Sequence, residues 1–204
     1  MPTDTQQKID GLVSVTEVLD FFIPKQLLDW YLKTGKAEAK RIGTVAMKIG
    51  SRVDELICQE INTGSYKLKA SDGQEVKNCL EAWKQFKQDY QPKVKHTQLT
   101  LADNIDKVIG HCDLLTDTTL IDIKCSSSIR DNYWVQVAKY YSMLPVEENT
   151  TVYQVAILRL DKNLGVYEYK THRDAKVNLT QCQSVFDGLL DAYRYYNPQR
   201  GTEE

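Results

Sequence analysis

The sequence has no long apolar segment, no paired cysteines and no marked excess of charge of one sign. No hydrophobic run approaches the ~18 residues needed to cross a membrane, and the polar first eight residues are unlike a signal peptide. We therefore expect a cytoplasmic protein. The formal net charge is only −2, from 26 basic and 28 acidic residues, so any binding to nucleic acid must come from a local groove and not from the whole molecule.

Cysteines, glycines and prolines are too few or too scattered to define a special architecture. The five cysteines are an odd set without a C-x-x-C pair, which indicates neither a disulfide framework nor a structural zinc site. The ten glycines and five prolines never cluster into a linker, while 42% of the residues are hydrophobic. This composition predicts a single domain.

The order of helical and strand-like segments indicates an α/β protein. A capping signal at Ser14 and a proline at position 24 start two short helices, and apolar residues at helical spacing predict longer ones over about 37–61 and 80–90. Apolar runs predict strands at about 94–101, 107–115, 119–125, 152–160 and 165–170, with helices at about 132–144 and 177–196. This order favours a central mixed β-sheet flanked by helices.

The segment from residue 107 to 127 is the most informative for function. If the chain reverses at residues 117–118, Asp113 faces Asp122 across an antiparallel pair. Directly opposed residues have Cβ atoms ~4.5–5.5 Å apart, where two carboxylates repel unless a positive charge lies between them. A divalent cation would supply that charge, and carboxylate oxygens suit Mg²⁺ or Mn²⁺ better than Zn²⁺.

A lysine is expected to lie beside these two acids. Strand alternation places Lys124 on the same face as Asp122, two residues earlier. The pattern [D/E]-x-K occurs five times in the chain, but only this copy lies in an apolar strand with an opposed acid, ahead of a helix that carries Gln136 and Tyr140 at i, i+4. The alternative is a solvated hairpin with a simple Asp/Lys contact, which burial of an aspartate among apolar neighbours disfavours.

Three motifs together resemble those of a known superfamily. Gly110-x-x-Asp113, Asp122-x-Lys124 with trailing serines, and Gln136-x-x-x-Tyr140 are similar in order and spacing to the PD-(D/E)XK nucleases. The likeness is to their RecB-like branch, which includes phage-type and mitochondrial-type single-strand exonucleases and CRISPR-associated nucleases. The likeness covers residues 13–196, which we take as a single domain with flexible termini at 1–12 and 197–204. It implies a restriction-endonuclease-like core and a metal-dependent phosphodiesterase activity.

The resemblance also implies roles for individual residues. Asp113 and Asp122 match the acids that bind the metal, the main-chain carbonyl of Ile123 matches a further metal ligand, and Lys124 matches the catalytic lysine. The remaining matches concern DNA and the orientation of the lysine: Gln136 and Tyr140 in the helix, and Ser126 and Ser127 at positions that often contact phosphate.

The sequence departs from the family pattern at two positions. The long helix usually carries a metal-binding histidine where this chain has Asp54, which we retain as a metal ligand because a carboxylate can bind the same cations. Glu55 is the fallback, although Arg52 is close enough on the helix to pair with it. Gln98 stands where many relatives carry a glutamate, and an amide cannot act as an anionic ligand.

These residues lead to one main hypothesis and two alternatives. The main one is a deoxyribonuclease that depends on Mg²⁺ or Mn²⁺, most simply an exonuclease acting on DNA ends or single strands in the cytoplasm of a bacterial or phage-infected cell. The alternatives are a catalytically weak or inactive nuclease-fold module that binds DNA or protein, and a subunit of a recombination or CRISPR-adaptation assembly with recombination or replication proteins as partners. No iron–sulfur cluster is expected, because only Cys182 lies late in the chain.

Other charged residues receive no specific role. Lys36, Lys40, Lys48 and Arg52 recur every four or eight residues along the long helix, but such a row drifts ~40° per step of four, so we favour a solvated surface over a phosphate-tracking row. The three histidines are isolated in the sequence and no function is assigned to them.

Overall fold

The computed structural model describes residues 11–149 and 151–198. The expectation of flexible termini falls almost entirely on residues outside these ranges. Across the described residues, none of the helices is both long and apolar enough to cross a membrane. The elements, in chain order, are β1 (Val13–Ser14), α1 (Val15–Phe21), α2 (Lys25–Thr34), α3 (Lys36–Thr63), α4 (Gln74–Tyr90), β2 (Val94–Asp103), β3 (Val108–Thr116), β4 (Thr119–Lys124), α5 (Asp131–Ser142), α6 (Val146–Asn149), β5 (Gln154–Leu160), β6 (Tyr167–Thr171) and α7 (Leu179–Tyr196).

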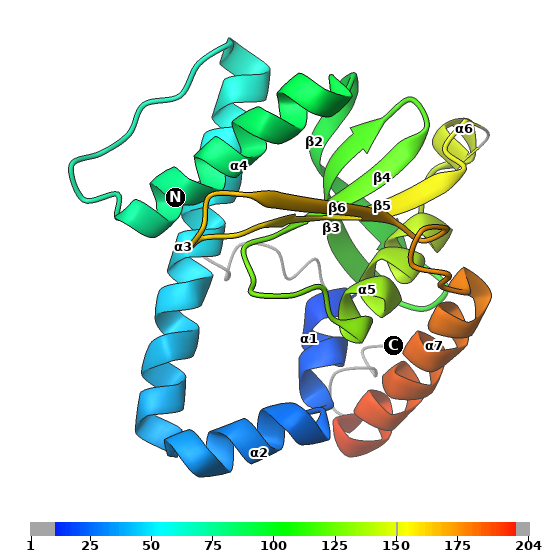
Figure 1. Ribbon diagram of the computed structural model, residues 1–204. Helices are drawn as coiled ribbons and strands as arrows, with labels where there is room; N and C mark the ends of the chain where they lie inside the picture. The colour runs from blue at the N-terminus through cyan, green and yellow to red at the C-terminus, as the bar shows by residue number, and fades with distance from the viewer. Residues whose placement is uncertain (1–10, 150, 199–204) are drawn as a thin grey trace.

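A six-stranded mixed sheet forms the centre of the molecule (Figure 1). Strand β3 pairs antiparallel with β2 on one side, and on the other side it pairs with β4 antiparallel and with the short β1 in parallel. Strand β5 lies parallel to β4, and β6 completes the sheet antiparallel to β5. The predicted α/β class, with a central mixed sheet flanked by helices, is confirmed.

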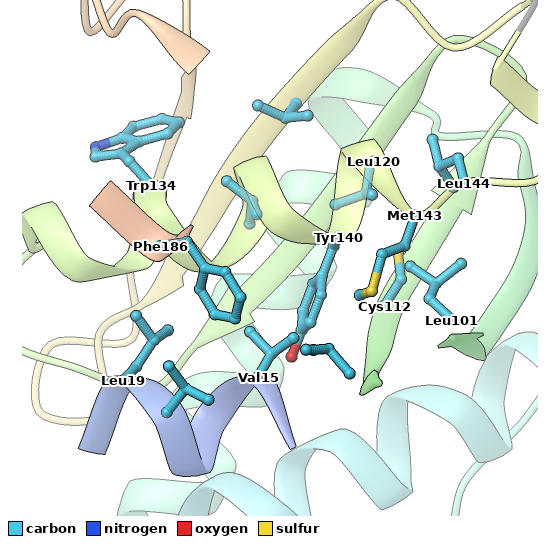
Figure 2. Close-up of a cluster of buried hydrophobic side chains, with 14 of the residues drawn as sticks. Val15, Leu19, Leu101, Cys112, Leu120, Trp134, Tyr140, Met143, Leu144 and Phe186 are labelled. Atoms are coloured by element: carbon cyan, nitrogen blue, oxygen red, sulfur yellow. The ribbon is translucent and has the colours of Figure 1, made fainter. Parts of the chain in front are cut away.

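Each face of the sheet supports its own hydrophobic core. One core joins the sheet to α1, α5 and α7, and Figure 2 shows part of it, with Tyr140 and Phe186 reaching in from α5 and α7. The other core joins the sheet to α3 and α4 through residues such as Leu56 and Trp83. Strand β4 contributes to both cores, because Leu120 contacts the first whereas Ile121 contacts the second. Every residue of β4 except Lys124 is therefore buried.

The structure adds two elements to the predicted order and changes several boundaries, most of all that of α4, which begins at Gln74 and not near residue 80. Strand β1 is only two residues long and α6 only four, so neither has enough residues to show a period in the sequence. Pro24 precedes α2 as its N-cap and is not its first helical residue. Ser14 caps α1 as expected, and its side chain accepts a hydrogen bond from the N–H of Thr16.

Candidate active site

The hairpin of β3 and β4 has the predicted register. Leu114 pairs with Ile121 and Leu115 with Leu120, which places Asp113 opposite Asp122 at the next step. The regular ladder ends at that step. There the side chain of Asp113 takes the place of a main-chain hydrogen-bond acceptor: its Oδ2 accepts a hydrogen bond of 2.7 Å from the N–H of Ile123. Asp113 is thus fixed to the strand that carries the other two site residues.

An irregularity in β2 and β3 accompanies this change. The β2–β3 pairing includes Thr97 with Leu114 and Leu99 with Cys112, but it omits the step between them. At that step Gln98 has a φ of 50°, in the left-handed region that side chains other than glycine seldom occupy. Its side-chain Nε2 donates a hydrogen bond of 3.1 Å to Asp113 Oδ1. Both oxygens of Asp113 are therefore held by fixed donors.

Asp122 and Lys124 lie on one face of β4, as the alternation predicted. Lys124 Nζ is 2.8 Å from Asp122 Oδ2, and Asp122 is only 2% exposed. Ile121 and Ile123 face the opposite core. Asp113, Asp122 and Lys124 therefore converge at the end of the hairpin, and the alternative of a solvated Asp/Lys contact does not fit an aspartate this deeply buried.

The surroundings of Asp54, Asp113 and Asp122 disfavour the ionised form of each carboxylate. Burial raises the pKa of Asp122 to about 7, and Asp113 adds to the rise while Lys124 opposes it. Burial likewise raises the pKa of Asp113. The pKa of Asp54, on α3, is raised by burial and next by the charge of Asp113. Close carboxylates with raised pKa values form a site that a cation would stabilise.

Lys124 stays protonated in these surroundings. Burial by itself would lower its pKa, but the charges of Asp122 and Asp113 more than offset that effect, so the pKa is raised. The Nζ also lies 5.2 Å from the centre of the Tyr133 ring, a favourable cation–π distance. Lys124 is therefore better suited to stabilise negative charge than to accept a proton.

The long helix brings Asp54 and not Glu55 to the site. Asp54 is close enough to Asp113, Asp122 and Lys124 for their charges to change its pKa. Glu55 is instead 60% exposed and pairs with Arg52 at 2.8 Å, which is the surface ion pair considered as the alternative for it.

Gln136 and Tyr140 are interior residues. They are 8% and 3% exposed, and Gln136 Nε2 donates a hydrogen bond of 2.9 Å to the hydroxyl of Tyr140. Burial raises the pKa of Tyr140 to about 12, with Asp122 adding to the rise and Lys124 opposing it. This places Tyr140 beside the acid–lysine pair, where it can help to orient the lysine. A contact of either residue with DNA stays a prediction.

The turn after β4 contains the two serines. The hydroxyl of Ser126 donates a hydrogen bond of 2.9 Å to the carbonyl of Ser128, while Ser127 is exposed. The carbonyl of Ile123 points toward the same edge of β4 as its N–H, because both groups of a strand residue are directed to the same neighbour. Since that N–H donates to Asp113, the carbonyl lies on the side of β4 where a cation shared with Asp113 would sit.

Sequence reasoning missed several neighbours of the site. Gln98 was noted only as a departure, whereas it directly holds Asp113. His111 is close enough to favour the charged form of Asp113, and its buried Nε2 has no hydrogen-bond partner within the described residues. Its position two residues before Asp113 was a usable signal, because alternate strand residues share a face. Asp20, on α1, is close enough to Lys124 for the lysine's charge to oppose the rise in the pKa of Asp20 that burial causes. Nothing in the local sequence around Asp20 indicated this proximity.

The arrangement suits a hard cation held by few protein groups. Asp122 Oδ2 is buried and makes no hydrogen bond with any described residue, although Lys124 Nζ is close to it. Among the described residues, no three Asp, Glu, His or Cys side chains are already arranged to hold a metal together. Mg²⁺ commonly needs only one or two carboxylates besides water and substrate phosphate, so Asp113 and Asp122 fit that ion, whereas the described residues form no closed zinc site.

Solved structures that the chain matches include two exonucleases. The chain matches the "putative exonuclease" of Eubacterium rectale with a TM-score of 0.53 at 16% sequence identity, covering 100% of this chain and 89% of the other. It also matches an alkaline exonuclease of Laribacter hongkongensis with a TM-score of 0.36 at 20% identity, and the same exonuclease in complex with dAMP with a TM-score of 0.35 at 19%, each covering 93% of both chains. No protein-family model and no curated protein matches the sequence.

The first of these similarities shows that the fold is shared with a known structure. At 16% identity it carries no information about individual site residues, so the functional argument depends on the geometry of this chain.

Proposed function

We propose that this protein is a metal-dependent nuclease of the PD-(D/E)XK superfamily that hydrolyses DNA, in keeping with the RecB-like motifs of its sequence. One observation carries the proposal: Asp113, Asp122 and Lys124 gather at the end of one hairpin, and Asp122 is paired with Lys124 at 2.8 Å while buried. A group of three acids and one lysine, of which Asp122 is buried and the others are partly buried, is costly to fold, which favours a functional reason for it.

The proposed ligands of the cation are the carboxylates of Asp113 and Asp122 and the carbonyl of Ile123, with Asp54 close enough to contribute. The three aspartates and Lys124 together carry a formal charge of −2 when all are ionised, which one Mg²⁺ or Mn²⁺ ion would balance. When bound, such an ion would activate water and polarise the scissile phosphate.

The protein's own groups would supply orientation and charge. The N–H of Ile123 and the amide of Gln98 hold the two oxygens of Asp113 in a fixed direction. Lys124, which stays protonated, would stabilise the negative charge that grows on the phosphate during hydrolysis. Tyr140 would limit the positions open to the lysine side chain, and Ser127, exposed in the following turn, would contact phosphate.

A second candidate is an inactive nuclease-fold module that binds DNA or protein. Lys124 Nζ lies against Asp122 Oδ2, the oxygen a cation would need, and no three acidic or other ligating side chains of the described residues are already arranged around a metal position. If the lysine kept that position in solution, the site would be neutralised internally and would not take a cation.

The experiment is digestion of end-labelled single-stranded and duplex DNA with Mg²⁺, Mn²⁺ and EDTA in turn. We expect cleavage with either metal, none with EDTA, and loss of cleavage in Asp122→Asn and Lys124→Ala. The matched controls are Asp117→Asn, an exposed acid in the turn of the same hairpin, and Lys170→Ala, from another [D/E]-x-K pair with Glu168 at 2.8 Å. Both controls should cleave like the parent protein.

Two results would reject the proposal. Cleavage that survives unchanged in Asp122→Asn or Lys124→Ala would place the activity elsewhere. Binding of DNA without cleavage under any metal would favour the inactive module. The labelled end that shortens first would in addition give the polarity, and internal fragments would show an endonuclease.

A further inference from the structure

The helical segment before the site is exposed to an unusual degree. Of the residues from Lys25 to Arg52 whose burial is described, Ala39 alone is buried. Figure 1 shows α2 and the first half of α3 extending away from the sheet, whereas the second half of α3 packs beside α4. We call residues 25–49 the arm. The arm is connected to the body at both ends, through α1 before it and through the later part of α3 after it.

The arm carries positive charge in a chain that is negative overall. It contains six basic and two acidic residues, giving +4, while the whole chain has a net charge of −2. Both acids are already paired, Asp29 with Lys25 and Glu38 with Arg41, each at 2.7 Å. Four lysines remain without an ion pair to any described residue: Lys33, Lys36, Lys40 and Lys48. This charge makes the arm complementary to a polyanion.

Two of these lysines lie on the same side of α3 as Asp54. At ~100° per residue, Lys36 projects in the direction of Asp54 and Lys40 about 40° from it, whereas Lys48 is about 120° away. With a rise of ~1.5 Å per residue, Lys40 is about 21 Å and Lys36 about 27 Å from Asp54 along the helix axis. The side of α3 that reaches the candidate active site therefore continues outward into basic residues.

The surface between Asp54 and these lysines is apolar and open. Met47 lies about 20° from the direction of Asp54 and is 60% exposed. No atom lies within 4 Å of a Cβ placed on Gly43 or Gly50, which are on the same side. Arg52, in contrast, is engaged by Asp72 at 2.9 Å and by Glu55, so it does not belong to this basic surface.

We propose that this side of the arm binds one unpaired DNA strand as it extends from the active site, with Lys36 and Lys40 contacting phosphates and Met47 contacting bases. The proposal rests on the nuclease function proposed above and specifies its substrate as single-stranded. An exposed apolar side chain beside the lysines favours an unpaired strand, because the base faces of a duplex are stacked and not available to it. The proposal also replaces the interpretation of this lysine row as merely solvated.

The test is binding of a long fluorescent single-stranded oligonucleotide, measured by anisotropy in EDTA over a series of salt concentrations. The variant is Lys36→Glu/Lys40→Glu, and the matched control is Lys77→Glu/Lys84→Glu, which makes the same charge change at two exposed lysines of α4. Each phosphate contact on a single strand contributes ~0.7 to the slope of log K against log salt, so we expect the slope to fall by about 1.4 and affinity to drop several-fold at low salt. The control should match the parent.

Equal weakening in both double variants, or an unchanged salt slope, would overturn the proposal. Lys36→Gln/Lys40→Gln, checked by circular dichroism, covers the case in which charge reversal disturbs the helix, and it should lower the slope to the same extent. Cleavage by the same proteins separates the two proposals. If the parent cleaves DNA but its affinity for DNA does not depend on the two lysines, the arm proposal alone fails. If DNA affinity depends on the two lysines but no metal supports cleavage, the nuclease proposal alone fails.

Discussion

The ring of Tyr140 occupies the space in which a Cβ on Gly110 would lie. Gly110 is on β3, three residues before Asp113, and Tyr140 is on α5, so this contact sets how closely the helix packs over the strand that carries the acid. Figure 2 shows the tyrosine within the surrounding core. The glycine of the Gly110-x-x-Asp113 motif is therefore explained by packing against the tyrosine of the Gln136-x-x-x-Tyr140 motif.

Gly110→Ala should displace α5 and impair the site. Tyr140 is 3% exposed and its ring cannot move without disturbing the core, so we expect a loss of about 1–3 kcal/mol in the free energy of unfolding, together with a loss of DNA cleavage. Urea denaturation measures the first and end-labelled digestion the second. Gly188→Ala is the control, because its helical position on α7 has open space, and it should leave stability unchanged or higher. Parent-like stability of Gly110→Ala would contradict the contact.

The sequence predicted those parts of the molecule that depend on local pattern. The hairpin register followed from the position of the turn, and the shared face of Asp122 and Lys124 followed from strand alternation; both are confirmed. The left-handed conformation of Gln98 could not be predicted from the sequence, because it comes from tertiary contacts between β2 and β3 and not from the conformational preference of glutamine. The proximity of Asp20 to Lys124 likewise depends on how α1 docks against the sheet.

Gln98→Glu should make the protein more dependent on a cation. The amide donor to Asp113 Oδ1 would be replaced by a carboxylate facing a carboxylate, which destabilises the metal-free site and adds an anionic ligand. We expect a lower Tm than the parent in EDTA and a larger rise in Tm on addition of Mn²⁺. Differential scanning fluorimetry with a Mn²⁺ titration measures both.

The control for this change is Thr100→Glu, which adds the same charge at an exposed position of β2 two residues further on. Its Tm should respond to Mn²⁺ as the parent does. If Gln98→Glu gained no more from Mn²⁺ than Thr100→Glu, the view that Gln98 borders the cation would be wrong.

Asp54→Asn should stabilise the metal-free protein while weakening its response to metal. The pKa of Asp54 is raised by burial and by Asp113, so its ionised form is unfavourable in the folded state, and removal of the charge relieves that cost. We expect a gain on the order of 1 kcal/mol in EDTA near neutral pH, or a Tm higher by ~2–4 °C. Isothermal titration with Mn²⁺ should show weaker binding.

Glu55→Gln is the matched control, since it removes the same charge from the next residue of α3. Glu55 is exposed and pairs with Arg52, so its loss should lower stability slightly or not at all and leave Mn²⁺ binding unchanged. A stabilised Asp54→Asn variant with unchanged Mn²⁺ binding would show that Asp54 is not a metal ligand, although its charge is unfavourable in the folded protein.

The contact of Asp72 with Arg52 should make the free energy of unfolding depend on pH in the acid range. Arg52 donates to both oxygens of Asp72 at 2.9 Å, and the N–H of Lys69 donates at 2.7 Å, which fixes the loop before α4 to α3. The hydrogen bonds from Arg52, and next that from Lys69, lower the pKa of Asp72 to about 2. Because the folded pKa lies below the unfolded value of ~3.9, the stabilisation is full above that value and is lost as pH falls toward 2.

Asp72→Asn should therefore be less stable than the parent at about pH 6, and the difference in unfolding free energy should narrow as pH falls through about 4 toward 2. Urea denaturation of both proteins across this range measures the difference. Arg52→Met should show the same narrowing, and the double variant should lose less than the sum of the two single losses, because both remove one interaction. A difference between parent and Asp72→Asn that stayed constant down to about pH 3 would mean that the ion pair does not hold the loop.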